Sequence, residues 1–344
     1  QQDSSQPAQQ DSSQPAQQDS SQPAQQDSSQ PGSAKDNITT PKESKVVANE
    51  EKKLPFETDW KIGDKFIYDS SNNYYESLEG LSGNALLTAL VKLQSSKTET
   101  GNYDKLKDFY KTTKAFKDNF YEKDGTLLDI YSENPNGEDP YTYPNYIGET
   151  RKKSEYLNNN VENKGTNREH VIPQSWFNKV DKMRNDPFHV WPTDIGVNGK
   201  RSNYPHDNVT SEVTFTALNG GKLGKNSISQ QVFEPIDAFK GDIARAYLYF
   251  ALTYGKDDIR KTAEAKEVFQ KESPYLVKHF LDTYLSWNKS DLVDEFDVVR
   301  NNVTSNWTKN KRRNPFIDYP NLVNSLFGNV PFHNLGVLVL KEAK

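Results

Sequence analysis

Residues 165–207 read GTNREHVIPQSWFNKVDKMRNDPFHVWPTDIGVNGKRSNYPHD, and they set a carboxylate beside an imidazole at Glu169 and His170. Asn198 and Arg201 follow in the VNGKRSN part of the same stretch. Hydrolysis of a phosphodiester needs a base for the attacking water, a cation for the phosphate charge and stabilisation of the leaving oxygen. Histidine is the usual base near neutral pH, and one carboxylate with one amide oxygen suffices to hold a hard cation such as Mg²⁺. The stretch therefore indicates metal-assisted hydrolysis.

Plainer interpretations of the same residues stay open. Glu169 could be an ordinary surface carboxylate and His170 a structural histidine. Asn198 precedes a glycine, and Asn-Gly is a strong turn signal. Adjacent residues on an extended segment point to opposite sides, so Glu169 and His170 can serve one site only at a turn or at the end of a strand.

The composition limits the classes of function. The chain has 344 residues and no cysteine, which excludes disulfides, thiolate metal sites and a cysteine nucleophile. Its formal net charge is -5, whereas nucleic-acid-binding proteins are more often basic, so local basic residues and a metal ion would have to offset that charge. No apolar run is long enough to span a membrane, and no signal peptide is visible. Because the chain starts with Gln rather than Met, we expect a processed or engineered form, and a removed export signal is the natural hypothesis.

The first part of the chain is of low complexity. QQDSSQPA occurs three times over residues 1–24 and returns as QQDSSQPG at 25–32. Gln, Ser, Asp and Pro bury too little apolar area to offset the entropy of ordering. We therefore predict a disordered tail and linker over residues 1–58 and one folded domain over residues 59–344. The tail would be either a stalk that holds the domain away from a cell surface or a linker without special purpose.

The remaining chain predicts a single α+β domain that is mostly helical. Apolar residues recur at helical spacing from Leu78 to Leu93, which indicates an amphipathic helix. GTLLDIY at 125–131 resembles a short strand, and ENPNGEDPYTYP after it reads as a loop. IARAYLYFALTY at 243–254 predicts a buried helix. Further helices are expected at 103–121, 263–269 and 274–287.

Several segments resemble the endonuclease I family of bacterial periplasmic and secreted nucleases, within the ββα-metal (His-Me finger) superfamily. The strongest matches are NREHVIPQSWF at 167–177 and PTDIGVNGKRSNYP at 192–205. A Glu-His pair alone would be weak, but three more blocks follow the order of the family: DIYSENPNGEDPY at 129–141, FEPIDAFKGDIARAYLYFA at 233–251 and RNPFIDYPNL at 313–322.

This resemblance implies a small ββα core and a role for each matching residue. It implies that His170, on a strand, is the general base, and that Glu169 and Asn198, the latter on a helix, hold one metal ion. Arg201, and with it Arg168, would bind the scissile or a neighbouring phosphate. The ion is expected to be Mg²⁺, with Mn²⁺ or Ca²⁺ as alternatives, because hard oxygen ligands select weakly among these cations. The resemblance also implies cleavage of DNA, and often RNA, with little sequence preference and 5′-phosphate products.

Two positions depart from the pattern of the family. Phe188 occupies a slot that is commonly histidine, although His189 follows and could orient the site from behind. Gly196 stands where several relatives carry an acid or an aromatic residue. Neither departure touches the implied base or the implied metal ligands.

A basic run at 300–313, RNNVTSNWTKNKRR, contains five basic residues and no acid. Such a run can bind phosphates, but it can equally be a solvated loop. The candidates for nucleic-acid contacts are therefore Arg168, Lys200, Lys309, Lys311 and Arg312. The other histidines, at 206, 279 and 333, are expected to be structural or exposed.

Two rival functions stay open. One is a sequence-specific HNH-like endonuclease, which would need a recognition module that is not visible. The other is a surface-displayed nucleic-acid-binding protein with an impaired nuclease site. For either, we expect a secreted or cell-surface protein, and a lipid-anchored precursor tethered through the N-terminal tail is a hypothesis.

Overall fold

A computed structural model of the chain describes residues 55–148 and 161–341, which belong to one compact unit. Nearly all of the predicted tail therefore lies outside the described residues. The backbone N–H of Thr58 donates to Asn324 Oδ1 at 3.0 Å, and the indole of Trp60 donates to the carbonyl of Val293 at 3.1 Å. The chain is thus anchored to the C-terminal part of the domain from its first described turn.

Helix α6 (Lys240–Tyr254) lies in the centre of the core, and from its second residue onward all its residues are buried. A helix that is apolar on nearly all sides must be covered on all sides. It packs against α8 (Lys278–Ser290) and α1 (Gly83–Ser96). The prediction of a buried helix at 243–254 is confirmed, and the fold class is α+β as expected.

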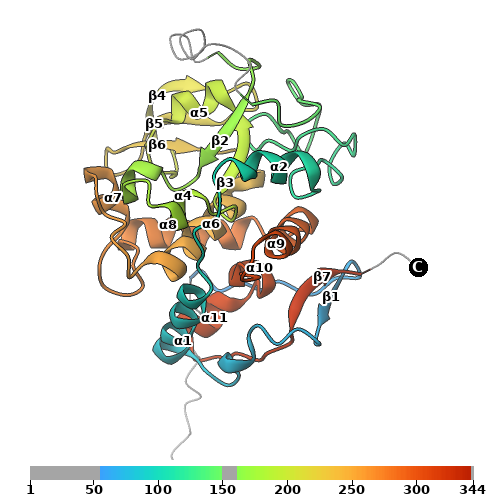
Figure 1. Cartoon of the computed structure of the whole chain (residues 1–344). Coiled ribbons are helices and arrows are strands. Elements are labelled where there is room, and N and C mark those ends of the chain that lie inside the picture. The colour runs from blue at the N-terminus through green and yellow to red at the C-terminus, as the bar shows by residue number, and fades with distance from the viewer. Residues whose placement is uncertain (1–54, 149–160, 342–344) are drawn as a thin grey trace, which may run out of the picture. The chain divides into compact units, whose positions relative to one another are not determined.

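The other helices surround α6 (Figure 1). Those of more than one turn are α2 (Lys105–Thr112), α5 (Ile195–Arg201), α7 (Ala263–Val268), α9 (Glu295–Trp307) and α11 (Leu322–Phe327). The short turns are η1 (Glu76–Leu78), η2 (Gln174–Phe177), α4 (Asp181–Arg184), η3 (Asp237–Phe239) and α10 (Pro315–Asp318). The predicted helix at 103–121 is much shorter in the structure. None of the described helices is long and apolar enough to cross a membrane.

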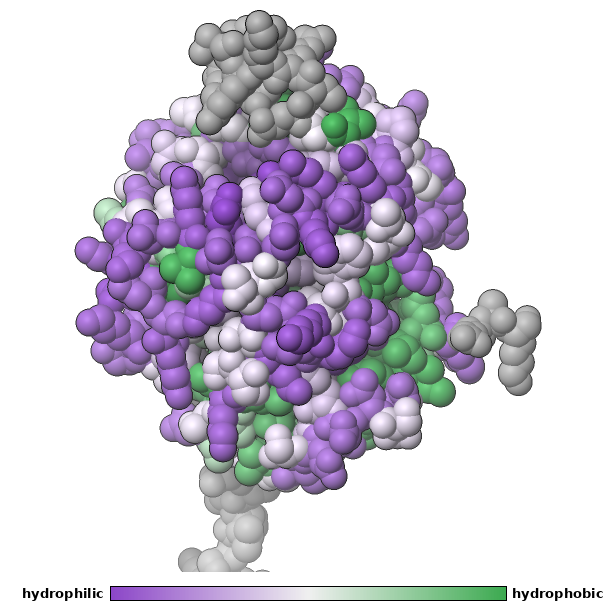
Figure 2. All heavy atoms as spheres, viewed as in Figure 1, coloured by the Kyte–Doolittle hydropathy of each residue, from purple (hydrophilic) through white to green (hydrophobic). Residues whose placement is uncertain are grey.

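Small antiparallel sheets complete the described part of the chain. Strands β4 (Ser211–Thr216), β5 (Lys222–Lys225) and β6 (Gln231–Glu234) form one sheet in this order. β1 (Phe66–Asp69) pairs with β7 (Val337–Leu340), so that the two ends of the domain meet. Figure 2 shows a mostly hydrophilic face with a hydrophobic area over β1 and β7. The third pair, β2 (Thr166–His170) with β3 (Val190–Asp194), carries the candidate site.

The predicted strand at 125–131 is wrong. The only strand-like pairing there, among the described residues, is a single bridge between Lys117 and Leu127. Leu127 donates its N–H to Tyr143 while Leu128 donates to Phe116, so successive residues bond different segments. The segment is a packed loop, and its side chains are buried without forming a ladder.

Candidate active site

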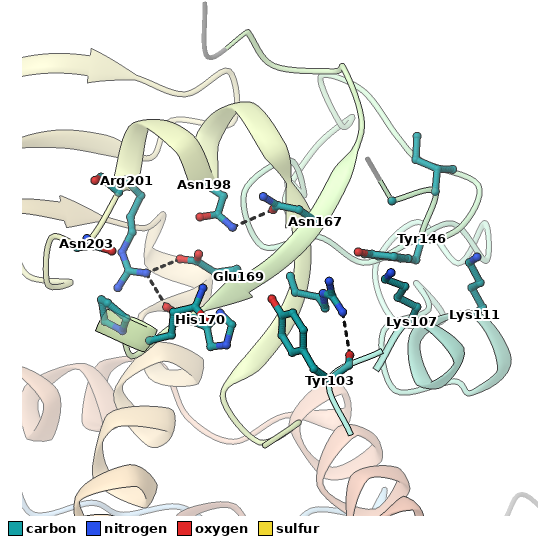
Figure 3. A pocket seen from close by; sticks show the side chains of 16 residues that line it. Tyr103, Lys107, Lys111, Tyr146, Asn167, Glu169, His170, Asn198, Arg201 and Asn203 are labelled. Carbon is teal, nitrogen blue, oxygen red and sulfur yellow. Dashed lines mark hydrogen bonds and ion pairs between the residues drawn. The ribbon is translucent and has the colours of Figure 1, made fainter. Parts of the chain in front are cut away.

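The site is built on a strand pair and the helix that follows it. β2 and β3 pair so that Glu169 lies opposite Trp191 and His170 opposite Val190. Helix α5 (Ile195–Arg201) starts directly after β3 because the Asp194 carboxylate accepts the N–H of Val197 at 2.8 Å. This is a ββα unit with His170 as the last strand residue and Asn198 on the helix. Because β2 ends at His170, its side chain and that of Glu169 are free to serve one cleft (Figure 3).

Glu169 is buried, and one of its carboxylate oxygens is fully occupied. Oε1 accepts the hydroxyl of Tyr131 at 2.7 Å and Nη1 of Arg201 at 2.7 Å. Burial raises the pKa of Glu169, and these two partners act in the opposite direction. No hydrogen bond among the described residues ends on Oε2, so that oxygen is available to a ligand in the cleft that Glu169 lines.

The imidazole of His170 is buried and neutral. Its Nε2 lies 3.0 Å from the carbonyl oxygen of Arg184. A carbonyl can only accept, so Nε2 carries the ring hydrogen and Nδ1 keeps a free lone pair. Burial lowers the pKa of His170 well below its usual value, and the neighbouring His189 and Arg184 side chains lower it further. The ring of Tyr103 stacks on the imidazole at 5.7 Å between centroids.

Asn198 presents an oxygen to the same cleft. Its Nδ2 donates to Asn167 Oδ1 at 2.8 Å, and its Oδ1, an acceptor, is free to ligate a cation. A carboxylate oxygen and an amide oxygen are ligands that hard divalent cations prefer. The donor set of Glu169 and Asn198 therefore fits a cation such as Mg²⁺, and it does not fit soft metals that select thiolates.

Arg201 does not have the role that the sequence suggested. Its ion pair with Glu169 is 2.7 Å long, and the two side chains are only 1% and 2% exposed. Its other N–H groups donate to the carbonyls of His170, Val171 and Tyr204 and to Nδ1 of His206. Arginine has five N–H donors, and all five are engaged within the protein. The expectation that Arg201 binds a phosphate is therefore corrected, because no donor is left for one.

His206 closes this buried network. Tyr131 donates its only hydroxyl hydrogen to Glu169, so the hydroxyl oxygen accepts a hydrogen bond from Nε2 of His206 at 3.0 Å. Nδ1 of His206 is then the acceptor for Arg201. Burial lowers the pKa of His206 well below its usual value, which agrees with a neutral ring. Glu169 is thus oriented by Tyr131 and Arg201, which His206 holds in turn.

One wall of the cleft is basic and aromatic. The cleft has a volume of about 590 Å³ and is lined by Tyr103, Lys107, Lys111 and Arg168 in addition to the residues above. The guanidinium carbons of Arg168 and Arg184 lie 3.5 and 3.9 Å from the centre of the Tyr103 ring. Such contacts fix the direction of the guanidinium groups. Arg168 therefore lines the cleft, and its contact with a phosphate stays a prediction.

Sequence reasoning missed the two lysines and Tyr103. Lys107 and Lys111 are four residues apart on α2 and so lie on one face of the helix. That spacing could have been noticed within the predicted helix. Tyr131 belonged to a matching block, but nothing in its neighbours indicated that it would bond Glu169.

The profile of the endonuclease I family matches residues 82–321 of the chain. This chain belongs to the endonuclease I family. It is 31% identical over 257 residues to an extracellular ribonuclease of Bacillus subtilis, and the aligned region covers 74% of this chain and 77% of that relative. An extracellular ribonuclease of Bacillus amyloliquefaciens is 31% identical over 253 residues, or 73% and 76% of the two chains. The protein is therefore a nuclease, a hydrolase of nucleic-acid phosphodiester bonds, and its family generally depends on a divalent metal.

The two departures from the pattern of the endonuclease I family are explained by packing. The ring of Phe188 lies 5.0 Å from that of Tyr249 on α6, and Phe188 does not line the cleft. A Cβ at Gly196 would lie 2.4 Å from the carbonyl oxygen of Val161, so only glycine fits there. His189 is fully buried behind His170, with ring centroids 6.0 Å apart, and its Nε2 bonds the carbonyl of Met183.

The basic run at 300–313 lies outside the catalytic cleft of this nuclease. Arg312 is 1% exposed and pairs with Asp186 at 2.7 Å, so its predicted phosphate contact is corrected. Lys309 and Lys311 are exposed, but neither lines the cleft, and Lys311 donates to the carbonyl of Asn306. Lys200 lies over the ring of Phe215 rather than in the cleft.

Proposed function

We propose that this nuclease is a metal-dependent endonuclease that cleaves DNA, and RNA as well, without sequence preference. The observation that supports it most is the convergence, in one cleft, of a neutral His170 with a free Nδ1 and two oxygen donors from Glu169 and Asn198. The products would carry 5′-phosphates, because attack on phosphorus would expel the 3′ oxygen.

The proposed chemistry starts at His170. Nδ1 takes the proton of the attacking water, and the Arg184 carbonyl that accepts from Nε2 stabilises the imidazolium that forms. Glu169 and Asn198 would hold a divalent cation, which supplies charge stabilisation at the phosphate and at the leaving oxygen. Arg201 keeps Glu169 in place through the buried ion pair.

The substrate is held through its backbone. Lys107, Lys111 and Arg168 line the cleft, and we expect them to contact phosphates of the substrate. Phosphate contacts carry no sequence information, which favours cleavage without sequence preference. Tyr103 offers an aromatic face next to His170 on which a base can stack. The relatives are named ribonucleases, and backbone contacts of this kind suit both RNA and DNA.

The decisive experiment compares wild type with His170→Ala on plasmid DNA and on RNA, each with Mg²⁺ and with EDTA. We expect metal-dependent degradation, and a loss of ~10²–10⁴-fold in the variant because the general base is gone. Binding of the substrate should survive, since the phosphate-contacting lysines remain. Near-wild-type cleavage by His170→Ala would refute the assignment.

The rival of a nucleic-acid-binding protein with an impaired site makes the opposite forecast. It expects binding without turnover for the wild type in Mg²⁺, Mn²⁺ and Ca²⁺. The two departures from the family pattern, Phe188 and Gly196, leave this rival possible, but Phe188 packs against α6 outside the cleft. We therefore favour an active enzyme.

We also propose that the protein acts outside the cell. Both relatives are named extracellular, and the absence of cysteine is compatible with export. Fractionation of cells that express the full-length gene should place nuclease activity in the medium or at the cell surface. Activity confined to the cytosol would contradict export.

A further inference from the structure

Three carboxylates outside the catalytic cleft converge on one point. Glu122, Glu133 and Asp139 each offer an oxygen, and these oxygens all lie within 4.8 Å of one another. Glu122 is exposed and Asp139 partly exposed, whereas Glu133 is only 1% exposed. All three belong to the irregular segment at residues 113–148 that follows α2, where Glu122 comes from one turn and the other two from the next.

The buried Glu133 has no protein partner to neutralise it. Both of its carboxylate oxygens are buried, and no N–H group or hydroxyl among the described residues donates to either; the neighbouring group is the carboxyl of Glu122. An ionised carboxylate that is buried without a partner is strongly unfavourable, so Glu133 must either take up a proton or bind a cation that compensates its charge. Within the described part of the chain, no ion pair with lysine, arginine or histidine involves any of the three carboxylates.

The neighbouring groups increase the negative charge further. Asp118 and Asp124 lie in the same segment of the chain, and their carboxylates accept hydrogen bonds from backbone N–H groups of their own turns. Asp139 receives one backbone N–H, from Asn134 at 2.6 Å. Burial raises the pKa of Glu133 to about 10, and Asp139, Glu122 and Asp118 add to this shift. Among the described residues, the neighbouring charges that act on Glu133 are therefore negative.

We propose that Glu122, Glu133 and Asp139 bind a divalent cation, and that the cation is Ca²⁺ in preference to Mg²⁺. Ca²⁺ takes six to eight oxygen ligands, commonly several carboxylates, in a flexible geometry. Mg²⁺ is usually bound through one or two carboxylates and keeps several waters, so a set of three carboxylates suits Ca²⁺ better. The exposed side at Glu122 leaves room for the waters that complete the coordination of Ca²⁺.

This site is separate from the catalytic donors and supports them indirectly. The N–H of Glu133 donates to the carbonyl of Asp129 at 2.8 Å, which closes the turn that carries Tyr131. The hydroxyl of Tyr131 in turn bonds Glu169. Asn219 also donates to the carbonyl of Glu133, which ties the turn to the loop after β4. A cation on Glu133 would therefore stabilise the segment that orients Glu169, without touching the substrate.

The test uses the full chain with Asn198→Ala, a change at a partly exposed position that removes a catalytic metal donor. Calorimetric titration with CaCl₂ is expected to find one bound ion, and Ca²⁺ should raise the Tm by several degrees over EDTA. Adding Glu133→Gln should abolish both effects, whereas adding Glu138→Gln, at an exposed acid outside the cluster, should leave them intact. Mg²⁺ at the same concentration should give a clearly smaller shift.

Several results would overturn the proposal. One is the absence of a Ca²⁺-dependent shift in Asn198→Ala, and another is a shift that Glu133→Gln retains. An equal response to Mg²⁺ would overturn the preference for Ca²⁺. If Glu133→Gln does not fold, Glu122→Gln replaces it, because that exposed side chain can change without loss of packing. Tm and binding need no turnover, so they report on this site whatever the catalytic assignment.

Discussion

Replacing Arg201 with alanine should lower the stability of the domain, and weaker substrate binding is not expected to be its direct effect. The change removes one partner of an ion pair whose side chains are 1% and 2% exposed, and breaking such a pair costs ~3–5 kcal/mol. Three backbone carbonyls also lose their donors. For a domain of this size, 1 kcal/mol corresponds to ~2–4 °C, so the Tm should fall by ~10 °C. Differential scanning fluorimetry and urea unfolding measure this loss.

Lys107→Ala is the matched control. Lys107 lines the cleft but is partly exposed, and its ion pair with the largely exposed Asp104 adds little stability. We expect an unchanged Tm and a raised KM. Arg201→Lys should recover part of the stability of Arg201→Ala, because it keeps the charge but not the five-donor geometry. If Arg201→Ala melted like wild type and only raised KM, Arg201 would be a phosphate ligand and the reasoning here would be refuted.

Four further results are expected. Lys111→Ala, in a His170→Ala background, should lower the slope of log K against log [salt] by ~0.7–0.9, and an unchanged slope would place Lys111 off the substrate path. Asn198→Ala should raise the Mg²⁺ concentration needed for half-maximal cleavage by ~10-fold or more, and an unchanged requirement in a metal titration would remove Asn198 as a ligand. Phe188→His should give no gain in kcat because the ring faces α6; a large gain would revive the impaired-site rival. Burial lowers the pKa of His189 from 6.5 to about 4, so between these pH values the unfolded chain binds a proton that the folded chain does not, and the free energy of unfolding falls as pH drops. In urea melts, His189→Gln should reduce this pH dependence by up to ~1.4 kcal/mol per pH unit. An unaltered pH dependence would contradict the role of His189.

The fold could be predicted where periodicity is decisive. Helix α6 is apolar on nearly all sides and was expected to be buried, as it is. The loop at 125–131 was mistaken for a strand because a short apolar run does not distinguish a strand from a packed loop. Leu127 and Leu128 are buried, but their N–H groups bond Tyr143 and Phe116, which lie in separate segments. Such pairing depends on distant residues that a local pattern does not contain.

The sequence motifs predicted which residues lie on the strand and the helix of the site. They did not predict which basic side chains are free to contact a substrate. Arg312 belongs to a run that looks like a basic surface loop, yet it is buried on Asp186, a residue 126 positions earlier. Arg201 sits two residues from solvated Asn203, and only the folded chain brings Glu169 and His206 around it. A basic residue in the sequence therefore shows that a positive charge is present, but only the folded structure shows whether it contacts a phosphate or a buried carboxylate.

The difference between charges that are paired inside the protein and charges that line the cleft explains how a chain of net charge -5 can act on a polyanion. Screening at physiological ionic strength limits exposed charges to a range of ~8 Å, so a phosphate in the cleft responds mainly to the nearest side chains. Those include Lys107 and Lys111, whereas Glu122, Glu133 and Asp139 are not among the described residues that line the cleft. A Ca²⁺ ion on these three carboxylates would cancel two more negative charges. The net charge of the sequence is therefore a weak guide to nucleic-acid binding, and the charge of the cleft is the quantity that matters.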